Sequence, residues 1–361
     1  MAYLCHHLQV VHWSTYPYWI VASGSDLLMR PTILSPYHEG AVDCRAYLAL
    51  KVRGFDDYAP CRVSMKRVLV VGAGIHGLVT AAREHIAKNQ VFIVEKRKRI
   101  GGRGTSEESF GHQLEHGPHL LLKGGELHKM VKKVSKVKPS LRPLRPNKVL
   151  IVGHGALYPI NSPKELLNLK LGKDPIRESA MRLISGWGQD IPERRQALVK
   201  GRLCVVGEGW SGLIGRLAST LEEVGVPIQT GIKITDSYDG GVVTSKGLKI
   251  EADEVRMCDG SVVGEAVKVS TLDVVLDNRP LKGLHGLVKG DVAILDLAAI
   301  HTKKAPGMSH FSCIALSGGV DAIEDLLDER VSGWRSHIIT KRENKSITLT
   351  DSRGHLSDGV I

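Results

Sequence analysis

The sequence predicts an α/β fold, and three observations between residues 67 and 95 predict it. Residues 67–71 (RVLVV) form a short apolar run rich in valine, which is typical of a buried parallel strand. Residues 72–77 (GAGIHG) follow at once and match G-x-G-x-x-G, the turn that joins such a strand to a helix. A second apolar run, 91–94 (VFIV), ends on Glu95, at the distance after the glycines that a dinucleotide fingerprint requires. The sequence therefore predicts a Rossmann-type dinucleotide-binding unit.

Each residue of this fingerprint has a physical role. Gly72 allows the tight turn, Gly74 lets the backbone approach a pyrophosphate, and Gly77 lets helix and strand pack closely. The pyrophosphate then lies at a helix N-terminus, where free N–H groups and the helix dipole favour an anion. Glu95 can accept hydrogen bonds from the ribose hydroxyls, and its charge repels a 2′-phosphate. We therefore expect no NADP in this site.

A second motif narrows the choice of cofactor. Gly101-Gly102-Arg103 comes six residues after Glu95, and together they resemble the E-x5-G-G-R motif of the flavin amine oxidase, protoporphyrinogen oxidase and phytoene desaturase superfamily. Residues 110–119 (FGHQLEHGPH) resemble the family's segment beside the isoalloxazine ring, and residues 207–231 resemble the helix and strand that return to the nucleotide-binding domain. The resemblance covers about residues 66–260. It implies a Rossmann-type, glutathione-reductase-like FAD-binding domain with an inserted α+β substrate domain.

The resemblance also implies that FAD is the cofactor and which residues contact it. These are Gly72, Gly74, Ile75, His76, Gly77, Glu95, Lys96, Gly102, Arg103, Gly117, Pro118, His119 and Ile234. No side chain can be named as catalytic, because the flavin itself accepts the hydride in this chemistry. His112, His116 and His119 follow a spacing that a metal site could use. An extended segment directs alternate side chains to opposite faces, however, so we expect no metal.

The remaining motifs predict the course of the chain. We expect the FAD-binding domain in residues 65–120 and 200–262, and the substrate domain in 121–199 and 263–340, followed by a C-terminal remnant, 341–361. Helices are expected at 125–137, from Ser162-Pro163 onward, at 211–224 before Gly225, and at 321–330. Strands are expected at 149–152, 156–160, 227–235, 242–244 and 249–250, with residues 239–241 (DGG) as a turn.

Residues 1–64 differ from the rest in composition. They hold six of the eight tyrosines and three of the six cysteines, without a sustained helical or strand period. Two interpretations remain, an accessory domain or an N-terminal extension without a structural role, and we favour a disordered or misassigned extension. No basic stretch precedes a compact apolar run with a cleavage site, so we do not expect this segment to be a secretory signal.

The chain carries 49 Lys and Arg against 38 Asp and Glu, and the excess lies after residue 64. Residues 123–148 hold nine cations and one acid, Glu126. Such a run attracts an anionic membrane surface, nucleic acid or an acidic substrate, or it is simply a solvated helix face. We expect no nucleic-acid partner, because the run has no aromatic residue to stack on bases. Peripheral membrane contact remains an expectation.

Cysteine usage and hydropathy bear on the compartment. Beyond residue 64 only Cys204, Cys258 and Cys313 remain, an odd number without paired spacing, which indicates a reducing compartment. No run of 18 apolar residues occurs. We expect a cytoplasmic protein that is peripheral to a membrane at most.

The resemblance favours one function and leaves two alternatives. The first is an FAD-dependent oxidoreductase that takes hydride from a C–H or C–N bond of a small apolar or amine-bearing substrate. The alternatives are a non-catalytic or fragmentary flavin-fold protein that binds a partner and an NAD-dependent dehydrogenase, which does not need Gly101-Gly102-Arg103. The family's closing G-D segment finds no match before Ile361. We therefore expect weak FAD binding by the isolated chain and a complementing polypeptide as a partner.

Overall fold

The computed structural model describes residues 9–11, 20–22, 65–134, 138–153, 156–159, 175–259, 267–301 and 307–349. The chain divides into two compact units, residues 1–63 and 64–361. In the first unit, strands β1 (Gln9–Val11) and β2 (Ile20–Ala22) pair antiparallel. The other residues before 65 lie outside the described part, so the expectation that 1–64 is an extension stays a prediction.

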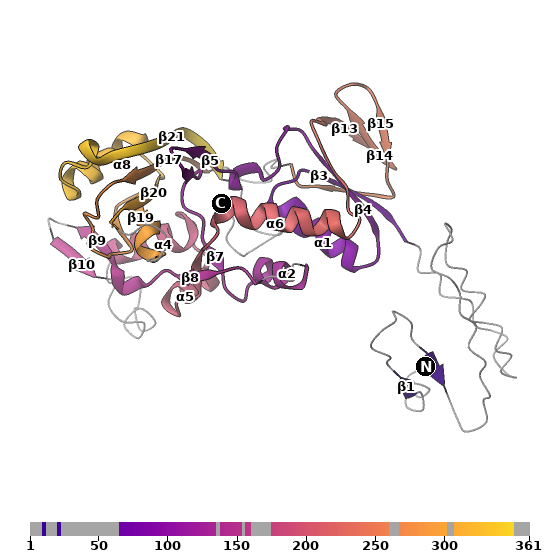
Figure 1. Cartoon of the computed structure of the whole chain (residues 1–361), viewed down its shortest axis with the longest axis horizontal. Coiled ribbons are helices and arrows are strands. Elements are labelled where there is room, and N and C mark those ends of the chain that lie inside the picture. Colours follow the sequence, from indigo (N-terminus) through magenta and orange to yellow (C-terminus); the bar gives the residue numbers. More distant parts are fainter. Residues whose placement is uncertain are drawn as a thin grey trace, which may run out of the picture. The chain divides into compact units, whose positions relative to one another are not determined.

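A parallel four-stranded sheet lies at the centre of one half of the second unit (Figure 1). Its order is β12 (Ile228–Thr230), β4 (Gln90–Glu95), β3 (Arg67–Val71) and β16 (Glu254–Met257). Apolar side chains cover both faces of β3: Val68 and Val70 lie in one core, and Leu69 and Val71 in another. The run of β-branched residues from 67 to 71 therefore forms a strand that is buried on both faces, as predicted.

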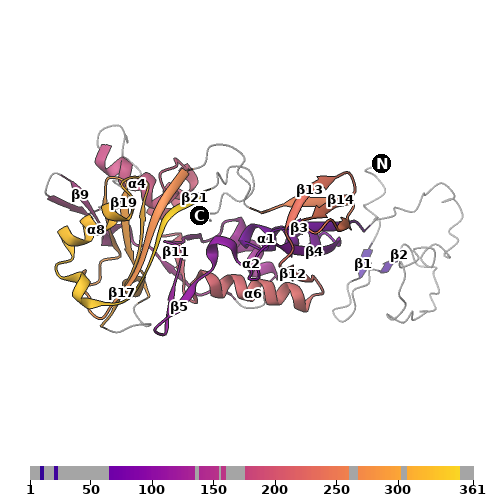
Figure 2. The same ribbon diagram turned by 90° about the horizontal axis from the view of Figure 1, so that it is seen from above.

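Helices cover one face of this sheet and a small antiparallel sheet covers the other (Figure 2). The helices are α1 (Ile75–Ile86), α2 (Glu126–Val134) and α6 (Gly209–Glu223), and the strands are β13 (Ile234–Tyr238), β14 (Gly241–Thr244) and β15 (Lys249–Glu251). Leu127 and Val131 attach α2 to the core of this half, although residues 121–199 were assigned to the substrate domain. The division into nucleotide-binding and substrate domains stays a prediction.

The other half of the unit is built on a seven-stranded mixed sheet. Its order is β10 (Ala156–Pro159), β9 (Val149–Gly153), β18 (Gly286–Lys289), β19 (Val292–Asp296), β20 (Ser309–Ala315), β17 (Val267–Leu276) and β21 (Ile338–Leu349). Only the β9–β18 pair is parallel. Helices α4 (Pro175–Gly186) and α5 (Pro192–Val199) pack on one face, and α8 (Gly319–Arg330) packs on the other. The short helix α7 (Leu297–Ile300) follows β19.

Short strands connect the two halves. A hairpin of β5 (Glu107–Ser109) and β6 (His112–Leu114) follows the Gly101-Gly102-Arg103 loop. A three-stranded antiparallel sheet has the order β7 (Leu121–Leu122), β11 (Leu203–Val206) and β8 (Leu141–Pro143). Single 3₁₀ turns occur at Gly102–Gly104, Pro146–Lys148 and Trp334–His337.

The α/β fold class is confirmed, and most predicted elements lie within a few residues of their expected bounds. One strand is a correction: the run expected at 227–235 forms two strands in different sheets. Gly231, at φ +78°, ends β12, and its N–H donates to the Arg97 carbonyl at 2.9 Å. A left-handed glycine cannot continue a pleated strand, so the chain turns there. The helix expected from Ser162-Pro163 lies outside the described residues.

Candidate dinucleotide-binding site

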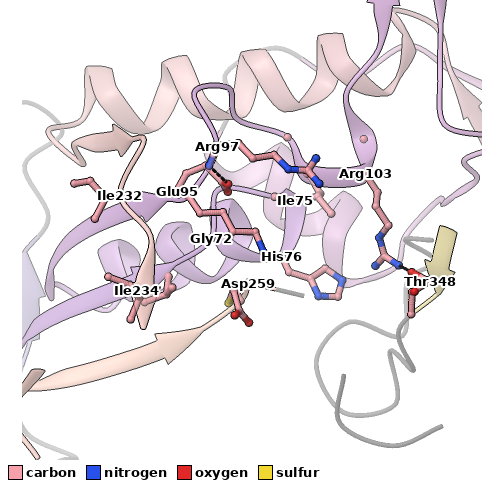
Figure 3. A pocket seen from close by; sticks show the side chains of 17 residues that line it. Gly72, Ile75, His76, Glu95, Arg97, Arg103, Ile232, Ile234, Asp259 and Thr348 are labelled. Carbon is pink, nitrogen blue, oxygen red and sulfur yellow. Dashed lines mark hydrogen bonds between the residues drawn. The ribbon is translucent and has the colours of Figure 1, made fainter. Parts of the chain in front are cut away.

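A cavity of about 260 Å³ lies at the carboxyl ends of β3, β4 and β16 (Figure 3). In parallel sheets this edge is where ligands bind. The lining comes from the turn after β3, the start of α1, the end of β4, the loop at 101–104, residues 232 and 234, the end of β16 and one residue of β21. The residues are Val71, Gly72, Gly74, Ile75, His76, Glu95, Lys96, Arg97, Gly101, Gly102, Arg103, Gly104, Ile232, Ile234, Cys258, Asp259 and Thr348.

The three fingerprint glycines differ in what surrounds them. A Cβ on Gly72, at φ +110°, would lie 2.4 Å from the Cys258 carbonyl oxygen, and a Cβ on Gly77 would lie 1.7 Å from the Gly72 oxygen. Both glycines are therefore required by the packing of the protein itself. Gly74 is different, because no atom of the described residues beyond its chain neighbours and its own helix lies within 4 Å of where its Cβ would be. Its side toward the cavity is open.

Gly74 is also the N-cap residue that precedes helix α1, and it provides no side-chain cap. The first turn of a helix carries N–H groups that have no partner within the helix. The positive end of the α1 dipole therefore faces a cavity with open space at Gly74. An anion such as a pyrophosphate fits this end of the cavity by charge and by room.

Glu95 closes another side of the cavity and is only 6% exposed. Its Oε2 accepts a hydrogen bond from the Ala73 N–H at 2.8 Å, and its Oε1 accepts one from the Arg97 N–H at 2.9 Å. These bonds fix the carboxylate beside the glycine turn, as Figure 3 shows. Each oxygen keeps a second lone pair, which can accept a ribose hydroxyl.

The Gly101-Gly102-Arg103 loop lies directly against the glycine turn. The Gly101 N–H donates to the Ala73 carbonyl at 2.8 Å, and both Gly101 and Gly102 have positive φ angles, +107° and +57°. Arg103 lines the cavity, and its Nη1 donates to the carbonyl oxygen of Thr348 at 2.6 Å. Burial lowers the pKa of this guanidinium from its ordinary value. The loop thus adds a fixed cation to the wall, next to the end of strand β21.

Residues 117–119 lie elsewhere in the structure, outside the lining of this cavity. A Cβ on Gly117 would lie 2.6 Å from the Thr271 Cγ2, so this glycine allows close packing on β17. The His119 ring stacks on Trp210 with centroids 5.2 Å apart, and His119 Nδ1 lies 2.8 Å from the Gly117 carbonyl. The expectation that Gly117, Pro118 and His119 lie beside a flavin ring stays a prediction.

A buried polar cluster joins this segment to the seven-stranded sheet, and no local sequence pattern predicts it. Asp273 of β17, 1% exposed, accepts hydrogen bonds from the Glu115 N–H and, at 3.0 Å, from Nε2 of His310. Glu115 in turn accepts from the Trp210 N–H of α6 at 2.7 Å, and its Oε2 lies 3.4 Å from Nδ1 of His119. The cluster therefore ties the start of α6 to strands β17 and β20 of the seven-stranded sheet.

The charges in this cluster shift one another's titration. Burial alone would raise the pKa of Glu115, but the hydrogen bond and charge of His119 bring it below its ordinary value. Burial alone would lower the pKa of His310, but the charge and hydrogen bond of Asp273 raise it. Both shifts favour the charged form of the group.

The segment that forms most of the cavity is similar to known proteins. Residues 70–134 match the family model of the NAD(P)-binding Rossmann-like domain. The phytoene desaturase of Fusarium fujikuroi is 46% identical over 57 residues, 16% of this chain and 10% of that protein. The bovine peroxisomal N(1)-acetyl-spermine/spermidine oxidase is 47% identical over 57 residues, 15% of this chain and 11% of that protein. The matched stretch is therefore about a tenth of the length of these relatives.

Solved structures share the fold over most of both chains at low identity. An oxidoreductase from Methanosarcina mazei has a TM-score of 0.57 at 17% identity, covering 77% of this chain and 88% of that one. Cyclohexylamine oxidase from Brevibacterium oxydans has a TM-score of 0.52 at 13% identity, covering 78% and 84%. Rab GDI from Plasmodium falciparum has a TM-score of 0.56 at 12% identity, covering 80% and 90%.

The motifs, the family model and the fold together define the class. The chain has a Rossmann-type nucleotide-binding segment in the fold of flavin amine oxidases. Over 57 residues it is similar to a phytoene desaturase and to an N(1)-acetyl-spermine/spermidine oxidase. Among the described residues, no helix is long and apolar enough to cross a membrane.

Proposed function

We propose that this chain binds FAD and acts as an FAD-dependent oxidoreductase. The substrate would be a small apolar or amine-bearing molecule that gives up hydride from a C–H or C–N bond. One observation carries the proposal: the glycine turn, Glu95 and Gly101-Gly102-Arg103 line a single cavity at the carboxyl end of a parallel sheet. The named activities of the relatives support the reaction class, although they match this chain over 57 residues only.

The residues present fit the dinucleotide part of this cofactor. The open side of Gly74 and the start of α1 would hold the pyrophosphate, with Arg103 adding a cation, and Glu95 would accept hydrogen bonds from the adenosine ribose. When bound, FAD would supply an isoalloxazine ring that accepts hydride. The protein's part is to bind and orient the cofactor.

Two features of the cavity favour FAD over NAD or NADP. The carboxylate of Glu95 is fixed by two backbone N–H groups, so it cannot swing away from a 2′-phosphate that it repels. A dehydrogenase of the simple Rossmann type does not need a loop with an arginine such as Arg103 at this place. The fold itself does not choose between an enzyme and a binding protein, because Rab GDI shares it. The proposal therefore depends on the lining of the cavity.

The visible absorbance of the purified protein tests the cofactor. We expect flavin bands in the protein as purified or after reconstitution with FAD, and no retention of NADPH in an equilibrium filtration experiment. Loss of the flavin bands on anaerobic mixing with a substrate amine or polyene would establish hydride transfer. A protein that retains NADPH and never FAD would contradict the assignment.

We further propose that the basic segment of residues 123–148 binds the surface of an anionic membrane. Its exposed cations are Lys123, Lys129, Lys132, Lys133, Lys138, Arg142 and Arg145. Glu126, the one acid in the segment, pairs with Arg83 of α1 and therefore does not neutralise them. The pKa of His128 supports a positive local field, because burial lowers it and the charges of Lys132 and Lys123 lower it further.

Vesicle sedimentation tests this surface. We expect binding to phosphatidylcholine vesicles that contain about 30% phosphatidylserine, and weaker binding at high salt. Replacing Lys129, Lys132 and Lys133 with Gln should weaken binding at least about tenfold, because each cation near such a surface contributes roughly 1 kcal/mol. The matched control replaces three exposed lysines elsewhere, Lys246, Lys268 and Lys282. Equal losses in both variants would mean that net charge, and not this surface, is responsible.

A further inference from the structure

The second residue of α1 is a histidine that lines the dinucleotide cavity. His76 follows Ile75 in the first turn of the helix, immediately after the open position at Gly74. In Figure 3 its imidazole extends from the start of α1 toward the side of the cavity where Arg103 meets Thr348. The glycine fingerprint does not require a side chain of this size here. An imidazole can gain a positive charge, which the glycines of the fingerprint cannot supply.

His76 differs in titration from every other residue that lines the cavity. The charged members are Glu95 on β4, Lys96 and Arg97 after it, Arg103 on its loop and Asp259 after β16. Acids and bases of these types ordinarily keep one charge state between about pH 5 and 8, whereas an imidazole changes charge in that range. Burial raises the pKa of the Cys258 thiol, which keeps it neutral there. Among the described residues that line the cavity, His76 is the one with a side chain of the type that changes charge in this range.

We propose that His76 makes dinucleotide binding proton-linked: the imidazole takes up a proton from solvent when the pyrophosphate binds. This inference rests on the proposed function, since it needs a pyrophosphate at the start of α1. Without a ligand, the positive end of the helix dipole and the charges of Lys96, Arg97 and Arg103 disfavour a protonated imidazole, while Glu95 and Asp259 favour it. Two negative phosphate charges at this end of the cavity would further favour the protonated imidazole.

The direction of the pH dependence follows. The imidazole has a higher pKa in the complex than in the free protein, so protonation strengthens binding. The added affinity is fully present below the free-state pKa and is lost as pH rises through the pKa of the complex. The phosphates themselves stay ionised over this range. Affinity should therefore increase about three- to tenfold from about pH 8 to about pH 5.5, because each unit of pKa shift corresponds to a factor of ten.

The test combines affinity with a count of protons. FAD binding is followed by flavin fluorescence across this pH range, and ADP-ribose, which keeps the pyrophosphate without the flavin, is titrated by calorimetry. Calorimetry in buffers of different ionisation enthalpy measures the protons taken up per ligand bound. We expect a fraction of one proton near neutral pH for both ligands, and none for His76→Gln. His85→Gln is the matched control, because His85 lies in the last turn of the same helix and outside the cavity lining.

The outcomes separate this inference from the proposed function. Binding of FAD and ADP-ribose with the same affinity at all pH values would overturn the inference alone, as would proton uptake that persists in His76→Gln. His76→Asn provides a second variant should His76→Gln fold poorly by circular dichroism. Failure of the wild-type protein to bind either ligand at any pH would overturn the proposed function and this inference with it.

Discussion

The two halves of the second unit obtain their polar sites in different ways. Around the parallel sheet, most of the cavity lining comes from one continuous stretch, 71–104, whose turns are fixed by glycines. In the seven-stranded sheet, the buried cluster of Asp273, His310 and Glu115 is assembled from three separate parts of the chain. The cavity at the parallel sheet depends mainly on the backbone geometry of one stretch. The buried cluster depends on each of its side chains. The two halves should therefore fail differently when a residue is changed.

The largest expected effect is at Gly77. Replacement by Val would place a Cβ 1.7 Å from the Gly72 oxygen, a backbone atom that cannot move aside without opening the turn. We expect a loss of more than about 4 kcal/mol in the free energy of unfolding, sufficient to prevent folding. The matched variant Gly74→Val should melt within a few degrees of wild type, because no atom lies within 4 Å of the new Cβ. Circular dichroism melting of both variants would show whether the two glycines differ as described.

Asp273→Ala should be the most damaging of the polar changes in the other half. The substitution leaves the Glu115 N–H and the His310 ring without their acceptor in a buried site. Removing one partner of a buried charged pair costs about 3–5 kcal/mol. Asp277→Ala is the control, since that carboxylate pairs with His337 on the surface and should change stability by less than about 1 kcal/mol. Urea unfolding that gives equal losses for the two would refute the importance of the cluster.

The same cluster predicts a pH window for stability. The pKa of Glu115 is lowered in the folded protein, so its contribution is present above the ordinary carboxyl value of 4.5 and is lost as pH falls through the folded pKa. The pKa of His310 is raised, so its contribution is full below the ordinary value of 6.5 and is lost as pH rises through the folded pKa. Unfolding by urea across pH should thus show two limbs. Glu115→Gln should flatten the acid limb and His310→Gln the alkaline limb, and a limb unchanged by its variant would be assigned to other groups.

The smallest effect is expected outside both halves. Residues 1–63 form a unit separate from 64–361. A chain that starts at Met65 should therefore keep the melting temperature of the full chain within about 2 °C. A markedly lower melting temperature, measured by calorimetry on both chains, would indicate that the first unit stabilises the second.

More of the site in the first half than of the cluster in the second half could be predicted from the sequence, for a physical reason. Gly72 and Glu95 lie in one strand–turn–helix–strand unit, β3–α1–β4, which dictates their spacing, and Arg103 follows shortly after it. Thr348 lines the same cavity but lies 245 residues from Arg103, so no local pattern points to it. Asp259 had a weaker signal, because it follows a strand next to β3 and so lies at the carboxyl edge of the sheet.

The cluster in the second half shows the same limit. Glu115 and Asp273 are separated by 158 residues, and their contact depends on the pairing of the seven-stranded sheet. The sequence marks Asp273 only as an acid in an apolar run, and Glu115 only as an acid within residues 110–119. The strand break at Gly231 was also missed, because it depends on a hydrogen bond to Arg97 at the end of β4.

Equilibrium titration of the purified protein with FAD, in parallel with Gly74→Val, tests whether this cavity is the dinucleotide site. We expect saturable binding of one FAD per wild-type chain. We expect the folded Gly74→Val variant to bind at least about a hundredfold more weakly, because its side chain would fill the space for the pyrophosphate. Equal FAD affinity in the two folded proteins would contradict the claim that this cavity is the dinucleotide site.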